Sequence, residues 1–162
     1  MVLVLMGVSG SGKTTIGKIL ADRLGWTFVE GDDFHPAANV AKMHAGIPLT
    51  DADRAPWLAA LRERIDAACE RGENVVLACS ALKHAYQDYL EQHEPDNVRY
   101  VYLHGSEELI RQRLTDRKGH FMNPNLLHSQ FEVLEPPTHA LRVEVSGAPE
   151  AVADEIRQKL RL

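Results

Sequence analysis

One short stretch near the start constrains this chain more than any other. The apolar run MVLVLM (residues 1–6) leads directly into GVSGSGKT (residues 7–14), which fits the spacing G-x-x-x-x-G-K-[ST]. Glycines in such a loop permit positive φ angles, so the backbone can bend until its N–H groups surround phosphate oxygens. Lys13 would reach the β- and γ-phosphates, and the hydroxyl of Thr14 can bind Mg²⁺. The stretch therefore predicts a P-loop, with Lys13 as a catalytic residue and Thr14 as the metal ligand.

The flanking segments have the structure that a P-loop requires. Residues 2–6 are continuously apolar, which suits a buried parallel strand. Residues 14–25 carry apolar side chains at helical spacing and end in a glycine, which is a helix stop signal. A flexible Gly/Ser turn that met the pattern by chance would lack this context. The predicted nucleotide-binding residues are Gly7, Ser9, Gly10, Ser11, Gly12, Lys13, Thr14 and Thr15.

Length and charge indicate the number of domains and the kind of molecule that this protein binds. The chain has 162 residues, which suits a single domain over 1–162, and a formal net charge of -5. Proteins that bind nucleic acid through its phosphates are usually basic, so the charge favours a small molecule. No apolar stretch is long enough to span a membrane, and residues 1–6 lack the length and basic flank of a signal peptide. We therefore expect a cytoplasmic protein, with Cys69 and Cys79 as reduced thiols.

Strand and helix signals alternate along the chain. We expect strands at 2–6, 26–30, 74–80, 98–103 and 141–146. We expect helices at 14–25, 36–45, 51–70, 83–92, 106–117, 126–135 and 149–160. Thr50 and Asp53 have the spacing of a capping box at the start of the third helix. The alternation predicts an α/β fold, in which helices cover both faces of a parallel sheet.

In such sheets ligands bind beyond the carboxyl ends of the strands, so residues that follow a strand are candidates for the site. Asp32 follows the second expected strand and could accept the proton of a substrate hydroxyl that attacks a γ-phosphate. The alternative is an ordinary acidic turn, with His35 as the N-cap of the next helix and Pro36 at its first position. Glu30 could reach a Mg²⁺ shell through water.

Arg54 and Lys83 each have two possible roles that the sequence does not decide between. Arg54 lies in the first turn of its helix, where a positive charge opposes the helix dipole. Either Asp51 or Asp53 compensates it, or a bound carboxylate does. Lys83 either holds substrate together with Ser80, which ends the third expected strand, or simply begins a solvated helix.

The end of the helix at 106–117 is rich in basic residues: Arg111, Arg113, Arg117 and Lys118. A basic cluster that leads into a Gly-containing loop suits a mobile lid, at about 117–126, that closes over a triphosphate. Arg117 would then meet the charge that develops in phosphoryl transfer. The alternative is a solvated basic face that pairs with Glu107 and Glu108.

Four segments together resemble the gluconokinases of the shikimate-kinase-like P-loop group: GVSGSGKTT, GDDFHPAANVAKMHAGIPLTDADRAPWL, CSALKHAYQDYL and RKGHFMNPNLLHSQFEVLE. The resemblance runs in register from Met1 to about Glu135. It implies a nucleoside-monophosphate-kinase-like fold with a mobile lid, and commonly a homodimer. It also implies transfer of the γ-phosphate of ATP, with Mg²⁺, to the 6-hydroxyl of D-gluconate, which gives 6-phosphogluconate and ADP.

The match places Arg117 and His120 in the lid motif, and it departs from the related pattern Asp-x-Asp at Glu30. Gluconate needs a cation for its carboxylate and hydrogen-bonding groups for its hydroxyls. The candidate substrate-binding residues are Asp32, His35, Arg54, Ser80, Lys83 and Gln130. Three alternatives stay open: a kinase for another small hydroxy acid such as shikimate, a nucleoside monophosphate kinase, and a P-loop switch that is not a kinase.

Overall fold

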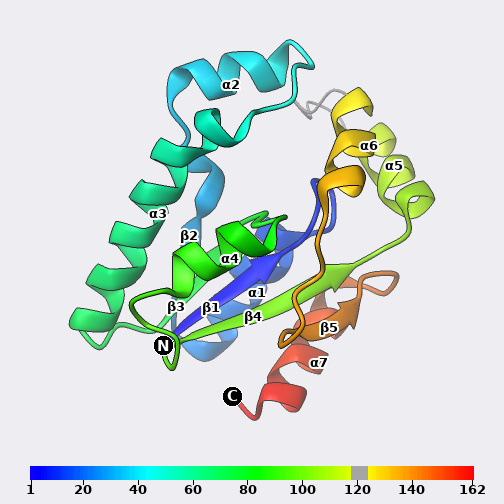
Figure 1. Ribbon diagram of the computed structural model, residues 1–162. Coiled ribbons are helices and arrows are strands. Elements are labelled where there is room, and N and C mark those ends of the chain that lie inside the picture. Colours follow the sequence, from blue (N-terminus) through cyan, green and yellow to red (C-terminus); the bar gives the residue numbers. More distant parts are fainter. Residues whose placement is uncertain (118–123) are drawn as a thin grey trace.

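The computed structural model describes residues 1–117 and 124–162. Lys118, His120 and most of the predicted lid lie outside the described residues. Figure 1 shows a central sheet with helices packed on both sides of it. Within the described ranges, no helix combines the length and the apolar character needed to cross a membrane.

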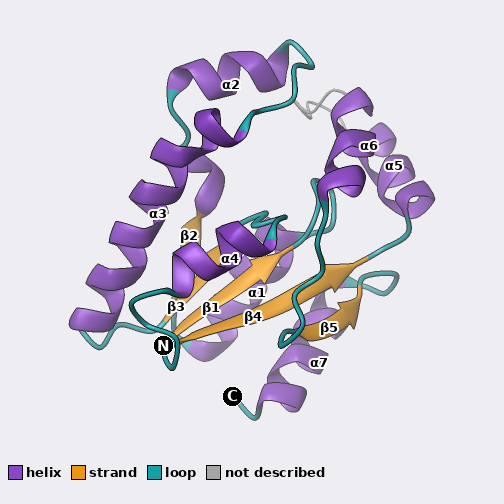
Figure 2. Ribbon diagram, in the orientation of Figure 1, coloured by secondary structure: helices purple, strands orange, loops and turns teal. Residues whose placement is uncertain are grey.

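The described sheet has five strands, all paired in parallel, in the order β2-β3-β1-β4-β5. The strands are Val2–Met6 (β1), Thr27–Glu30 (β2), Val75–Ala78 (β3), Val98–His104 (β4) and Leu141–Glu144 (β5). The first strand lies in the middle, where Val4 is opposite Leu77 on one side and Tyr100 on the other. Figure 2 shows these strands as one twisted sheet. The predicted α/β fold class is confirmed.

Helices connect the strands. They are Lys13–Leu24 (α1), Ala37–His44 (α2), Asp51–Glu70 (α3), His84–Glu91 (α4), Glu107–Asp116 (α5), Pro124–Val133 (α6) and Pro149–Leu160 (α7). A short 3-10 helix, Gly31–Phe34 (η1), follows β2. The capping box of α3 is present: Asp53 N–H donates to Thr50 Oγ1 at 3.1 Å, and Thr50 N–H donates to the Asp53 carboxylate at 2.9 Å.

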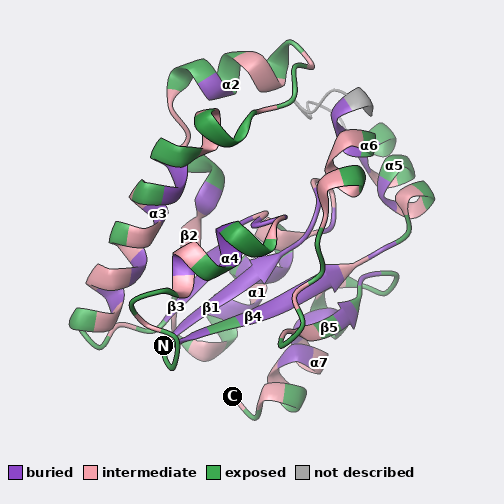
Figure 3. Ribbon diagram, viewed as in Figure 1, coloured by how far each residue is buried: buried purple, intermediate pink, exposed green. Residues whose placement is uncertain are grey.

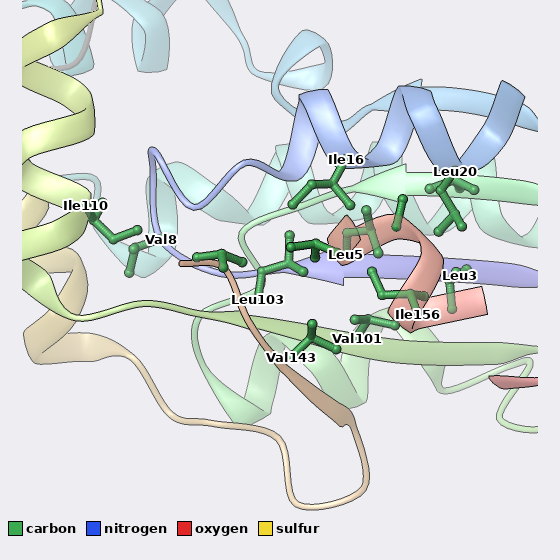
Figure 4. Packing of buried hydrophobic residues seen from close by; sticks show 14 of the residues in the cluster. Leu3, Leu5, Val8, Ile16, Leu20, Val101, Leu103, Ile110, Val143 and Ile156 are labelled. Atoms are coloured by element: carbon green, nitrogen blue, oxygen red, sulfur yellow. The ribbon is translucent and has the colours of Figure 1, made fainter. Parts of the chain in front are cut away.

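Each face of the sheet has its own apolar core, and Figure 3 shows that the central strands β1 and β3 are buried. Leu3 and Leu5 of β1 point to the face covered by α1, α5 and α7, which Figure 4 shows from close by. Val4 and Met6 point to the opposite face, where α3 and α4 cover them. Burial on both faces explains why the central strands β1 and β3 are apolar throughout rather than alternating.

Most element boundaries differ from the expectation by one or two residues; for example, β3 ends at Ala78, so Ser80 follows the strand rather than ending it. Two further differences lie next to the site. His35 is not the N-cap of α2, because residues 31–34 form the 3-10 helix and Pro36 takes the capping position. His35 instead ends the 3-10 helix, where its N–H donates to Asp32 O at 3.2 Å. The helix expected at 126–135 begins earlier, at Pro124, which agrees with the preference of proline for the first turn of a helix.

Candidate active site

A pocket lies at the carboxyl ends of β1, β2 and β3, and we call it the strand-end pocket. Side chains from the loop after β1, from η1, from α3 and from α6 line it. Residues expected from the sequence are among the lining residues: Ser9, Lys13, Asp32, His35, Arg54, Ser80 and Gln130. In Figure 1, α2 stands on one side of this region and α6 on the other. The structure therefore brings together five of the six predicted substrate residues, and Lys83 is the exception.

The loop after β1 has the geometry of an anion site. Gly12, immediately before α1, has φ 96°, which is in the left-handed region that favours glycine. No side chain caps the start of α1, so its first backbone N–H groups are available to an anion. Lys13 Nζ donates to the carbonyl oxygens of Gly7 and Val8, each at 2.9 Å, so its ammonium group lies over the loop.

The charge of Lys13 faces two carboxylates. Burial lowers the pKa of Lys13, and the nearby Asp32 and Glu30 oppose that shift. The interaction with Asp32 means that a carboxylate from the end of β2 lies within electrostatic range of the P-loop ammonium. An acid and a cation in one pocket are suited to a substrate that donates a proton as it reacts with a phosphate.

Glu30 joins the end of β2 to the P-loop. Thr14 Oγ1 donates a short hydrogen bond to the Glu30 carboxylate, and the other carboxylate oxygen accepts from Asp32 N–H at 3.5 Å. A hydroxyl and a carboxylate are both oxygen ligands, which is the donor set that Mg²⁺ prefers. Among the described residues, no group of three or more His, Cys, Asp or Glu side chains forms a separate metal cluster.

Trp57 of α3 holds the turn that carries Asp32. Its indole N–H donates to Gly31 O at 2.8 Å, and its ring stacks on His35 with centroids 4.4 Å apart. Gly31 itself packs against the end of β3, where a Cβ atom would lie 2.4 Å from Ala78 O. Sequence reasoning missed Trp57. The available signal was its position three residues after Arg54, which places both on one face of the helix.

Arg54 lines the strand-end pocket without a direct ion pair to a described carboxylate. Asp51 accepts from Lys83 Nζ at 2.8 Å, and Asp53 accepts from Lys42 Nζ at 2.8 Å, so both neighbouring acids bind other cations. Among the described residues, no carboxylate lies within ion-pair distance of Arg54. Its Nη1 donates instead to the Tyr86 hydroxyl at 3.2 Å. Tyr86 in turn donates a hydrogen bond to Asp51, and the charge of Arg54 helps to lower the pKa of Asp51. The adjacent acid thus compensates Arg54 only indirectly, and binding of a carboxylate by Arg54 stays a prediction.

These ion pairs also account for Lys83. Its hydrogen bond lowers the pKa of Asp51, and the same contact raises the pKa of Lys83. The hydrogen bond from Lys42 lowers the pKa of Asp53 to about 2. Lys83 does not line the strand-end pocket and instead binds Asp51 in the first turn of α3.

Gln130 ties α6 to the P-loop. Its Oε1 accepts from Ser9 N–H at 2.7 Å, and its Nε2 donates to Ser9 Oγ at 3.3 Å. Gln130 also lines the strand-end pocket, so one side chain contacts both the phosphate loop and the pocket wall. The sequence indicated Gln130 as a polar group of the site, but not that it pairs with Ser9.

The basic end of α5 is divided between two environments. Arg111 pairs with Glu107 at 2.8 Å, which is the solvated arrangement considered above. Arg113 donates to Val145 O, and together with Arg117 it lines a second pocket that also includes Gly10, Gly12 and Thr15. We call this the α1–α5 pocket. It lies beside the P-loop, and the charge of Arg117 contributes to lowering the pKa of Lys13.

Comparisons with known proteins agree with this geometry. The AAA domain family (AAA_33) matches residues 2–137. A probable gluconokinase of Xenopus tropicalis is 49% identical over 152 residues, 85% of this chain and 80% of the relative. The gluconokinase of Gluconobacter oxydans is 46% identical over 157 residues, 95% of this chain and 88% of the relative.

A solved structure extends the agreement to three dimensions. The gluconokinase from Sinorhizobium meliloti superposes with a TM-score of 0.85 at 41% identity, covering 98% of this chain and 94% of that one. Identity at this level over nearly the whole length of both chains reaches well beyond the P-loop segment. The chain belongs to the gluconokinase family of P-loop kinases.

Proposed function

We propose that this protein transfers the γ-phosphate of ATP to the 6-hydroxyl of D-gluconate and releases 6-phosphogluconate and ADP. The observation that carries the proposal is one pocket that holds Lys13, Asp32 and Arg54, the last with no carboxylate partner among the described residues. A phosphate-binding ammonium group, a proton acceptor and a guanidinium group without a direct ion pair match the γ-phosphate of ATP and the hydroxyl and carboxylate groups of a sugar acid. The relatives named above are gluconokinases, which supports gluconate as the acid.

On the nucleotide side, the P-loop residues 7–15 would bind the phosphates of ATP through backbone N–H groups. Lys13 would stabilise the charge that develops on the transferred phosphoryl group. Arg117 is placed in the α1–α5 pocket, beside Gly10 and Thr15, and would contribute a second positive charge. The proposal thus assigns binding to the loop and charge stabilisation to Lys13 and Arg117.

The donor set at the P-loop fits Mg²⁺, because Thr14 and Glu30 bring a hydroxyl and a carboxylate together there. Thr14 would hold the ion, with Glu30 beside it. When bound, Mg²⁺ neutralises charge on the β- and γ-phosphate oxygens.

On the acid side, Asp32 would orient the 6-hydroxyl and accept its proton as the new P–O bond forms. Much of the benefit in loose phosphoryl transfer comes from positioning, and the turn at Asp32 is fixed by the Trp57–Gly31 hydrogen bond. Arg54 would bind the carboxylate of gluconate with two parallel hydrogen bonds. His35, Ser80 and Gln130 would contact the remaining hydroxyls, and Lys83 would act indirectly by holding Asp51.

The proposal is tested by measuring ADP release from MgATP with different acceptors. We expect gluconate to stimulate ADP release strongly, and phosphorus NMR to identify 6-phosphogluconate as the product. Faster turnover of shikimate or of AMP would assign the site to a different acceptor. Equal ADP release with and without every acceptor would indicate a P-loop switch instead. We also propose that the protein is cytoplasmic, from its expected reduced thiols, and a homodimer, as the resemblance implies. Sedimentation of the purified chain would measure the oligomeric state.

A further inference from the structure

The surroundings of His35 leave one of its ring nitrogens free. One face of the ring stacks on Trp57, with an angle of 10° between the planes. Nδ1 lies 3.2 Å from Asn39 Nδ2. Nε2 has no hydrogen-bond partner among the residues that the structure describes, and the ring lines the strand-end pocket. Nε2 is therefore the polar atom that His35 can offer to a ligand.

The orientation of the Asn39 amide follows from a second contact. Asn39 is only 4% exposed, and its Nδ2 lies 2.8 Å from the backbone carbonyl oxygen of Asp53. A carbonyl oxygen can only accept a hydrogen bond, so the atom that faces it must be the amide nitrogen. The flipped amide would place two acceptors against each other in a buried position, which is costly.

This orientation decides where His35 carries its proton. One hydrogen of the Asn39 amide goes to Asp53 O, and the other points to His35 Nδ1. Nδ1 must accept that hydrogen, so it carries none of its own, and the proton of the neutral ring is on Nε2. Burial lowers the pKa of His35, while Asp32 on η1 raises it and Arg54 on α3 lowers it.

We propose that Asn39 is a positioning residue that holds His35 in the Nε2–H form, so that His35 donates a hydrogen bond to a hydroxyl of the sugar acid. This inference rests on the proposed function and adds the direction of one substrate contact. Asp32 accepts from the substrate, whereas His35 donates to it. A hydroxyl group can do both at once, which an ether or a carbonyl oxygen cannot. The pair would thus favour a polyhydroxy acid over acids that lack hydroxyls.

The first test reads the proton position directly. Nitrogen-15 NMR of the free wild-type protein distinguishes the two neutral ring forms, and the His35 signals are those lost in His35→Phe. We expect a neutral ring with the proton on Nε2 at neutral pH. A proton on Nδ1, or a charged ring, would overturn the proposal. This measurement needs no substrate, so its outcome is separate from whether gluconate is phosphorylated.

The second test uses substrate binding. His35→Phe keeps an aromatic ring on Trp57 but removes the donor, and we expect KM for gluconate to rise by about fivefold to tenfold, the scale of one neutral hydrogen bond. KM for ATP should stay unchanged, because the P-loop is not altered. An unchanged KM for gluconate in His35→Phe would overturn the substrate contact.

The third test replaces the hydrogen-bond donor that faces His35 Nδ1 with an acceptor. In Asn39→Asp a carboxylate faces Nδ1, so the neutral ring keeps its proton there and Nε2 becomes an acceptor. The charged ring still donates from Nε2, so KM for gluconate should rise as pH increases through the His35 pKa, which the carboxylate raises. Val40→Asp is the matched control, because it adds the same charge to an exposed neighbouring position of α2. Parallel pH profiles for the two variants would contradict a role for Asn39 in proton placement.

If Asn39→Asp does not fold, Asn39→Ala takes its place in the NMR measurement. Removing the donor should let the His35 ring populate both neutral forms, whereas wild type populates one. A ring that stays entirely in the Nε2–H form without Asn39 would show that Asn39 does not hold it, and would overturn the proposal.

Discussion

The P-loop and the turn that follows β2 are built in different ways. Lys13 bonds to Gly7 and Val8, which lie within six residues of it. The turn at Gly31 is held by Trp57, 26 residues away in the sequence. The position of Lys13 over the P-loop thus depends on local sequence, although Ser9 of the same loop also pairs with Gln130, 121 residues away. The turn is held mainly by a residue from a distant segment.

The same contrast extends to the other groups of the strand-end pocket. Arg54 is held by Tyr86, 32 residues away, and Asn39 is held by the carbonyl of Asp53, 14 residues away. A phosphate-binding loop serves many kinases, so a compact motif suffices for it. Recognition of one acid needs groups from several helices, and their positions depend on how those helices pack.

The comparison predicts that P-loop substitutions impair phosphoryl transfer, whereas substitutions on the acid side impair gluconate binding. Lys13→Ala should have the largest effect, because it removes the charge that stabilises the transferred phosphoryl group. We expect kcat to fall by roughly a hundredfold or more, the scale for one preorganised electrostatic group. Initial-rate kinetics with saturating gluconate and MgATP would measure it. Near-normal turnover in a folded Lys13→Ala protein would remove the basis for the P-loop role.

Arg54→Ala should cause a defect confined to the acid side. Loss of a charge-assisted contact with the gluconate carboxylate should raise KM for gluconate by about tenfold to a hundredfold and leave KM for ATP unchanged. Lys83→Ala is the comparison variant, because Lys83 also lies near Tyr86 but pairs with Asp51 outside the pocket. A larger effect from Lys83→Ala than from Arg54→Ala would mean that the carboxylate-binding cation is assigned to the wrong residue.

Trp57→Phe should have the smallest catalytic effect and tests the long-range support of the turn. Phenylalanine keeps a ring for His35 but cannot donate to Gly31 O, which would be left buried without a partner. We expect a loss of about 1–3 kcal/mol in the free energy of unfolding, measured by urea denaturation. KM for ATP should not change. Equal stability of Trp57→Phe and wild type would show that the hydrogen bond to Gly31 does not hold the turn.

Much of the fold could be predicted because its signals are local. The apolar runs, the capping box at Thr50 and the helix stop at Gly25 each depend on a few neighbouring residues, and the structure contains all three. The pocket could be predicted in outline because parallel strands end at the same edge of a sheet. That rule predicts that Asp32 and Lys13 lie in the same pocket, and both of them line it.

The rest could not be predicted because it depends on which helices meet. The sequence alone left Arg54 with two explanations. Weighing them needs the partners of Asp51 and Asp53, which are Lys83, just before α4, and Lys42 of α2. Gln130 meets Ser9 across 121 residues, a contact that no spacing indicates. The sequence predicts His35 as the N-cap of α2, whereas Pro36 takes that position and His35 ends the 3-10 helix. The 3-10 helix at residues 31–34 has no clear local signal in the sequence.

The central claim is that Asp32 orients the attacking hydroxyl of gluconate, and a matched pair of variants tests it most directly. Asp32 and Asp33 are adjacent acids in η1, but only Asp32 lines the strand-end pocket. Asp32→Asn removes the charge and keeps the size of the side chain, so the protein should fold and bind ATP. We predict that kcat with gluconate falls by roughly a hundredfold or more in Asp32→Asn, the scale for a lost general base, and changes little in Asp33→Asn. Equal effects of the two variants, or a larger effect from Asp33→Asn, would contradict the account.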